Sequence, residues 1–221
     1  TGADVPGFFF SAPEDLVVRF FQAGSFVPLF RGHSWYFSKD KEPYSFSEPT
    51  VSLVRDAIRL RYSLLREWYS GFEKAVRTKS PPLSPCFSDS GRAVTDQFLL
   101  FDKLLVAPVL ERDREQRLLY LPAGAWYQLG DTQTRFEGNS WIVVPVNLAS
   151  MPVFVREGTI LTRNEPCLRT SITLSQPETF ECYRDAHGQA SGYWFDEKAG
   201  GYSLAVSAEQ EQVVRVRMPK D

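Results

Sequence analysis

Four side chains in the first 33 residues could together bind a polar ligand. They are a carboxylate, an aromatic ring, a guanidinium and an imidazole, at Asp4, Phe8, Arg31 and His33. The three polar groups offer hydrogen-bond donors and acceptors in several directions, and an aromatic ring suits the wall or rim of such a site. We therefore expect these four residues to form one pocket.

The spacing of these residues places a requirement on the backbone that carries them. Arg31 and His33 are two positions apart, so at a strand end they would project from the same face. Asp4 meets them only if the helix between them runs back alongside the strands. Consecutive βα units of a barrel have this geometry, and the loops at the carboxyl ends of their strands converge on one pocket.

The segment between the two groups predicts the required helix. Residues 11–14 have the Ser-x-x-Glu spacing of a capping box, and a proline is tolerated in the first turn. One apolar stripe follows, formed by Leu16, Val17, Phe20 and Phe21. Gly24 is a suitable helix end, and the apolar run 25–30 has the length of a strand that ends at Arg31.

The next 50 residues predict a loop and one long helix. Residues 34–49 are aromatic and charged without a sustained period, which indicates a long ordered loop. From about residue 50 to 78, apolar residues hold one helical face and charged residues the other. The Ser-Pro-Pro-Leu-Ser-Pro sequence at 80–85 interrupts this pattern, so we place a domain boundary there.

The remainder of the chain has the pattern of an antiparallel β protein. Short apolar runs alternate with Gly, Asp and Pro turns at intervals of about 8–12 residues, which is typical of a β-sandwich. The runs are 98–101, 104–109, 118–121, 126–127, 141–146, 152–155, 171–174, 181–183, 202–206 and 213–216. We therefore predict an α/β chain with the end of a barrel at 1–80, a β-sandwich at 81–165 and the start of a second β domain at 166–221.

Composition narrows the classes of partner. A net charge of −2 over 221 residues gives no basic surface for nucleic acid. The sequence has neither an apolar run of the roughly 18 residues that span a bilayer nor the features of a signal peptide, so no membrane association is expected. The chain starts at Thr1 rather than Met, which we interpret as an internal start within a longer chain.

The three cysteines show no metal-ligand spacing. Cys86, Cys167 and Cys182 form no Cys-x-x-Cys or Cys/His motif, so neither a metal nor another cofactor is predicted. A disulfide between Cys167 and Cys182 is one alternative. We expect three buried free thiols.

A series of short motifs runs in order along most of the chain. They are Gly-Ala-Asp-Val-Pro-Gly-Phe at 2–8, Phe-Arg-Gly-His at 30–33, Arg-Tyr-Ser-Leu-Leu at 61–65, Asp-Gln-Phe-Leu-Leu at 96–100, Leu-Leu-Val-Ala-Pro at 104–108, Tyr-Leu-Pro at 120–122, Trp-Tyr at 126–127 and Pro-Val-Phe-Val-Arg-Glu-Gly at 152–158. In this order they resemble the C-terminal half of glycoside hydrolase family 31. Within that family, Glu-Pro at 42–43 followed by an aromatic residue resembles the catalytic (alpha) subunits of glucosidase II.

The resemblance implies both a fold and a division of roles. The fold is the last strands and helices of a (β/α)8 TIM barrel followed by β-sandwich domains, and the activity is that of a retaining α-glucosidase acting on terminal α-linked glucose. Asp4, Arg31 and His33 would line the subsite of the released glucose, with Phe8 near the rim. A retaining mechanism needs a nucleophile and an acid/base carboxyl. The resemblance places both in motifs upstream of Thr1, so this chain alone is expected to be inactive.

The same resemblance implies partners and a location. They are an oligosaccharide or N-linked glycan substrate, the N-terminal remainder of the enzyme, a non-catalytic beta subunit, and the endoplasmic reticulum lumen or another secretory compartment. Two departures leave the substrate open: Pro6 replaces the first Gly of a Gly-Gly-Phe sequence, and Ser-Trp-Tyr-Phe at 34–37 replaces a histidine-containing segment. A maltase, an α-xylosidase, an inactive carbohydrate-binding relative, and a structural or partner-binding role for residues 86–221 are the alternatives.

Overall fold

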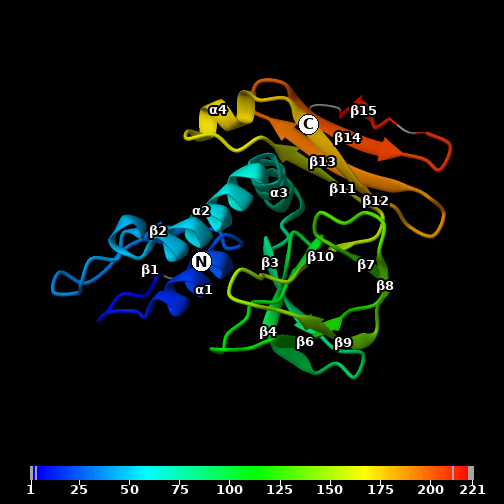
Figure 1. Ribbon diagram of the computed structural model, residues 1–221. Coiled ribbons are helices and arrows are strands. Elements are labelled where there is room, and N and C mark those ends of the chain that lie inside the picture. Colours follow the sequence, from blue (N-terminus) through cyan, green and yellow to red (C-terminus); the bar gives the residue numbers. More distant parts are fainter. Residues whose placement is uncertain (1, 3, 211, 219–221) are drawn as a thin grey trace.

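The computed structural model describes residues 2, 4–210 and 212–218. Figure 1 shows three parts in chain order: a helical part with two short strands, a β part beneath it, and a second β sheet above it. Helix α3 (Leu65–Thr78) lies between the two β parts.

The helical part begins with the βα arrangement that the candidate residues require. Strands β1 (Asp4–Val5) and β2 (Arg31–Gly32) are parallel, and helix α1 (Glu14–Gly24) connects them. A short 3-10 turn η1 (Pro43–Ser45) and helix α2 (Glu48–Ser63) follow. The core of this part is formed by Val5, Val17, Val18, Phe21, Val54 and Ala57. The apolar faces of α1 and α2 therefore hold β1 in place.

Two details of the predicted α1 region are wrong. Helix α1 starts after Pro13 without a side-chain cap, so the capping box does not form. The Glu14 carboxylate instead accepts hydrogen bonds from the hydroxyls of Ser47 and Thr50 at the start of α2. Residues 25–30 do not form a strand, because the Arg61 guanidinium binds the backbone carbonyls of Ser25 and Val27, each at 2.9 Å.

The long helix predicted at 50–78 is two helices. α2 ends at Ser63 and α3 begins at Leu65, and Leu64 between them has φ −101° and ψ 12°. The Leu64 side chain is buried in the core that α3 shares with both β parts. The break lets α3 take a new direction and pack against both sheets.

The first β part is a six-stranded antiparallel sheet with a strand pair on one face. Its strands lie in the order β3 (Leu83–Phe87), β4 (Ala93–Leu100), β5 (Leu104–Val106), β10 (Val153–Arg156), β7 (Ala125–Gln128) and β8 (Arg135–Glu137). The pair is β6 (Gln116–Leu121) with β9 (Ser140–Pro145). Leu105 and Phe154 pack with β6, whereas their neighbours Leu104 and Val155 pack with Trp68 of α3. Because successive side chains of a strand point to opposite faces, both faces of the six-stranded sheet are buried at β5 and β10.

The second β part is a five-stranded sheet. Its order is β12 (Glu178–Tyr183), β11 (Thr159–Asn164), β13 (Ala190–Asp196), β14 (Gly200–Val206) and β15 (Val214–Arg217). Since β11 pairs with β12 and β13, this sheet begins before residue 166. The strand predicted at 171–174 is wrong: Thr170–Ser175 is helix α4, with Thr173 fully buried.

Consecutive charged residues of α3 tie the two β parts together. Arg66 is buried, with its Nε 2.8 Å from Glu178 Oε1 and its Nη1 3.2 Å from Asp196 Oδ2. Glu67 is buried too, and it accepts hydrogen bonds from Lys103 Nζ at 2.9 Å and from the backbone N of Thr162 at 2.7 Å. These contacts fix both sheets to one helix.

The cysteines are free thiols as predicted, but the prediction that all three are buried is wrong for two of them. Cys86 is buried, Cys167 and Cys182 are half-buried, and all three are free thiols. Among the residues that the structure describes, no helix has the length and apolar character needed to cross a bilayer.

Candidate functional site

Asp4 and Arg31 form an ion pair across the two parallel strands. They are register partners in β1 and β2, and Arg31 Nε donates to Asp4 Oδ1 at 2.9 Å. The Asp4 side chain is 23% exposed and that of Arg31 is 52% exposed. An ion pair this open contributes roughly 0–1 kcal/mol to stability, so both groups are free to bind a ligand at little cost to the fold.

Phe8 and His33 meet in the loops that follow these strands. β2 ends at Gly32, so His33 starts the next loop rather than continuing the strand. The two rings lie 5.4 Å apart between centroids and are tilted by 40°. The loops are joined where the backbone N of Trp35 donates to Phe8 O at 2.9 Å. The structure therefore places the four predicted residues in two contacting pairs, Asp4 with Arg31 and Phe8 with His33.

A buried lysine that the sequence did not point to supports this site. Lys41 is 7% exposed, and its Nζ donates to Gly7 O at 2.7 Å and to Phe9 O at 3.2 Å. Burial lowers the pKa of Lys41. Because the ammonium binds backbone carbonyls rather than side chains, it holds the 7–9 turn in place without leaving a pattern in the sequence.

The turn after β1 has a backbone that needs its glycine. Gly7 has φ +104°, and its N–H donates to Asp4 O at 2.7 Å. A side chain at this φ would be strained, so the turn requires glycine after Pro6. Pro6 itself is buried and has no N–H to offer a ligand.

The arrangement suits binding better than bond cleavage. The set of four contains one carboxylate, which already faces a guanidinium, whereas a retaining glycosidase needs two carboxyls about 5–5.5 Å apart. A carboxylate, a guanidinium and an imidazole beside a phenyl ring can bind several hydroxyl groups of one neutral ligand.

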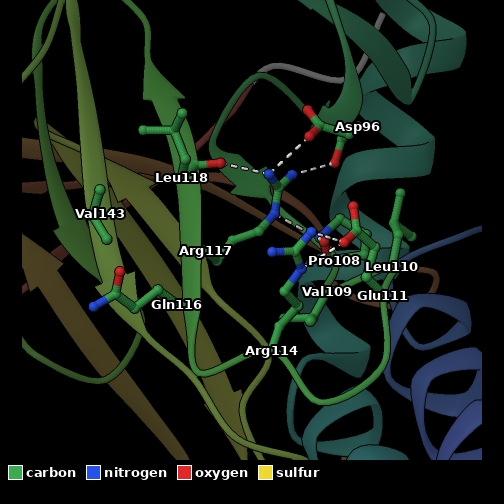
Figure 2. Close-up of a pocket in the computed structure, with 10 residues that line it drawn as sticks. All are labelled: Asp96, Pro108, Val109, Leu110, Glu111, Arg114, Gln116, Arg117, Leu118 and Val143. Carbon is green, nitrogen blue, oxygen red and sulfur yellow. Dashed lines mark hydrogen bonds and ion pairs between the residues drawn. The ribbon is translucent and has the colours of Figure 1, made fainter.

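In a hollow beside β6, the charged side chains Asp96 and Arg117 pair with each other. The hollow encloses about 430 Å³ and is shown in Figure 2, where Arg117 reaches toward Asp96. Arg117 Nη1 lies 2.7 Å from Asp96 Oδ2, Nη2 donates to Asp96 O at 2.8 Å, and Nε donates to Pro108 O at 3.1 Å. Asp96 is therefore a structural partner of Arg117, whose three guanidinium nitrogens all contact protein oxygens.

Comparison with protein families identifies two consecutive domains. Residues 1–71 match the glycosyl hydrolases family 31 TIM-barrel domain, and residues 79–161 match the glycosyl hydrolase family 31 C-terminal domain. Both matches confirm the predicted fold class, the end of a barrel followed by β domains.

The names of proteins similar to this chain agree with these two family matches. Glucosidase 2 subunit alpha of Schizosaccharomyces pombe is 35% identical over 203 residues, covering 88% of this chain and 22% of its own length. Human neutral alpha-glucosidase AB is 34% identical over 222 residues, covering 97% of this chain and 23% of its own length. The crystal structure of a Tris-bound glucosidase II alpha subunit superposes with a TM-score of 0.85 and 28% identity over 94% of this chain and 24% of its own.

The chain thus spans less than a quarter of the length of these relatives. The matched domains occur in the family's order and together account for residues 1–71 and 79–161. This chain belongs to glycosyl hydrolase family 31.

Proposed function

We propose that this chain is the C-terminal part of a retaining α-glucosidase that releases terminal α-linked glucose. The observation that carries the proposal is the pairing of Asp4 with Arg31 across β1 and β2, next to the Phe8–His33 contact. Family membership and the names of the relatives support the same reaction.

In this proposal the chain holds the sugar and other residues break the bond. Asp4, Arg31 and His33 bind hydroxyl groups of the released glucose, and Phe8 forms the rim. The nucleophile and the acid/base lie outside the 221 residues, which fits a chain that spans 22% of its relative from S. pombe. The segment alone is then inactive.

We further propose that the substrate is an N-linked glycan in the endoplasmic reticulum. One similar structure, with a TM-score of 0.84 and 28% identity, is a glucosidase II alpha subunit bound to Glc1Man2. Another is an endoplasmic reticulum glucosidase II complex of the catalytic subunit with the binding domain of a regulatory subunit. A regulatory subunit is the partner we expect for the full-length enzyme.

Other substrates of the same family are the second candidate. An α-xylosidase from Xanthomonas citri superposes with a TM-score of 0.82 at 26% identity. A Flavobacterium johnsoniae dextranase superposes with a TM-score of 0.84 at 25% identity. The ratio of kcat/KM for matched α-glucosides and α-xylosides decides between them, and the proposal requires the glucoside to be preferred. An inactive carbohydrate-binding relative would turn over neither.

The site assignment is tested by Asp4→Asn and His33→Ala in the full-length enzyme. Each is expected to lower kcat/KM on an α-glucoside by at least about 30-fold, because a charged or buried hydrogen bond to the sugar is worth about 2 kcal/mol in the transition state. Asp15→Asn is the matched control, since Asp15 forms a comparable open ion pair with Arg112, outside the site on α1. Its kcat/KM is expected to stay close to that of the parent, and near-parent turnover in both site variants would contradict the assignment.

A further inference from the structure

Arg61 of α2 holds the backbone segment that leads into β2. Its Nη1 donates to the carbonyls of Ser25 and Val27, each at 2.9 Å, and its Nη2 donates to Pro28 O at 3.3 Å. Two residues after Pro28 the chain reaches Arg31, the first residue of β2. A side chain outside the candidate site therefore binds the backbone that carries one of the site residues.

The Arg61 guanidinium also contacts two aromatic rings. Its Cζ lies 4.3 Å from the centroid of the Trp68 ring and 5.2 Å from that of Phe30. Such contacts between a cation and a ring are attractive, and more so away from water. Burial lowers the pKa of Arg61 to about 10, so the side chain stays protonated at neutral pH. Trp68 is buried in the core that α3 shares with both sheets, so Arg61 connects this core to Phe30, the residue before Arg31.

The segment held by Arg61 has few other means of placing β2. Residues 25–30 lie outside helix and strand, and the backbone carbonyls of such a segment need partners from elsewhere in the fold. Within the described chain, β2 pairs with β1 at two positions, Asp4 with Arg31 and Val5 with Gly32. The ion pair between Asp4 and Arg31 is open to solvent and adds roughly 0–1 kcal/mol. The position of Arg31 therefore depends on how segment 25–30 is held.

We propose that Arg61 is a positioning residue for the candidate site: by binding the carbonyls of Ser25, Val27 and Pro28, it sets the place at which the Arg31 guanidinium meets the sugar. This inference rests on the proposed function of Asp4, Arg31 and His33. Arg61 acts through the backbone and does not touch the ligand. Its effect on the reaction is nevertheless measurable, because a shift of about 1 Å in a binding group can cost about 100-fold in rate.

The chain contains a matched control arginine away from the site. Arg184 Nη1 donates to the carbonyls of Gly188 at 2.6 Å and Ser207 at 2.7 Å, and its Nη2 donates to Gln210 O at 2.8 Å. Arg61 and Arg184 are both half-buried. Arg184 directly follows β12, whose end lies at the right of Figure 1, whereas β1 and β2 lie at the left. Arg184→Met therefore measures the general cost of losing an arginine that binds three carbonyls.

The test is a double-mutant cycle on kcat/KM for an α-glucoside in the full-length enzyme. Arg61→Met is expected to lower kcat/KM about tenfold in the parent, but about threefold or less in the Arg31→Ala background, because the side chain that it positions is then absent. Arg184→Met should leave kcat/KM close to that of its background in both cases. Arg61→Lys keeps the charge and loses the planar fork, so a loss of about threefold in the parent is expected.

Thermal midpoints of all variants show which of them fold. If Arg61→Met does not fold, Arg61→Lys takes its place in the cycle, and its loss should disappear in the Arg31→Ala background. Equal losses in both backgrounds, a loss of the same size from Arg184→Met, or no loss from either Arg61 variant would overturn the positioning role. Near-parent kcat/KM in Arg31→Ala alone would instead overturn the proposed sugar-binding role of Arg31.

Discussion

At the scale of single residues, the ion pair between Asp4 and Arg31 has two possible uses. Arg31 could serve as a structural partner that neutralises Asp4, or it could bind the ligand. The two uses are compatible, because a guanidinium has five N–H donors and the structure commits only Nε to Asp4. The 52% exposure of Arg31 favours a role beyond the fold.

Arg31→Lys separates these uses. Lysine keeps the charge but loses the planar fork, so we expect kcat/KM on an α-glucoside to fall about tenfold. The free energy of unfolding is expected to change by less than about 1 kcal/mol, because the pair is open to solvent. Steady-state kinetics and thermal denaturation of the same preparation check both. A stability loss of several kcal/mol, with kinetics that follow it, would mean that Arg31 is structural.

The contact between Asp4 and Arg31 could be predicted from residue types and spacing. One helix length separates the two residues, so consecutive parallel strands place Asp4 opposite Arg31. Lys41 could not be predicted. Its partners are backbone carbonyls, whose positions depend on the folded loops and not on any residue type.

At the scale of elements, the correct predictions are those where one local pattern decides. Helix α1 buries Val17 and Phe21 of its predicted stripe, although Leu16 is exposed. The apolar runs predicted at 104–109 and 152–155 contain β5 and β10, which are buried on both faces. The wrong predictions are those where tertiary contacts decide. Segment 25–30 has the composition of a strand, but the Arg61 guanidinium donates hydrogen bonds to two of its backbone carbonyls. Residues 50–78 have the pattern of one helix, but the helix is interrupted at Leu64, whose side chain is buried in the core.

The contact between α3 and the five-stranded sheet makes a prediction about pH. Asp196 Oδ1 accepts the backbone N–H groups of Lys198 and Ala199, and Oδ2 pairs with Arg66 Nη1 at 3.2 Å. The backbone N–H of Ala199 is the largest cause that lowers the pKa of Asp196, and Lys198 and Arg66 add to it. The folded pKa lies below the ordinary value, so the stabilisation is complete above about pH 4 and is lost as the pH falls through the folded pKa.

Asp196→Asn tests this, because asparagine keeps the Oδ1 acceptor and removes the charge. The variant is expected to be less stable than the parent by about 1 kcal/mol at pH 7, a figure that allows for the partial exposure of the side chain. The difference should shrink as the pH is lowered from 7 to 3, through and below the ordinary aspartate pKa of about 3.9, measured as thermal midpoints across that range. Asp102→Asn, in an ion pair where Asp102 is 80% exposed, is the control. A destabilisation that is the same at both pH values would contradict the linkage.

At the scale of the whole molecule, the three parts share one core. Phe26 and Trp68 come from the helical part, Val106 and Val155 from the six-stranded sheet, and Tyr183 from the five-stranded sheet, and all are buried in the same cluster. Arg66 and Glu67 add polar ties to both sheets. Residues 86–221 therefore share a buried core with the helical part.

The central claim is that Asp4, Arg31 and His33 hold the glucose that the enzyme releases. The most direct test is a crystal structure of the full-length protein with glucose bound. The account predicts that hydroxyl oxygens of one glucose lie within hydrogen-bonding distance, about 2.6–3.2 Å, of the Asp4 carboxylate, the Arg31 guanidinium and the His33 imidazole, with the ring beside Phe8. Glucose bound at another place, with these three side chains contacting only protein or water, would contradict it.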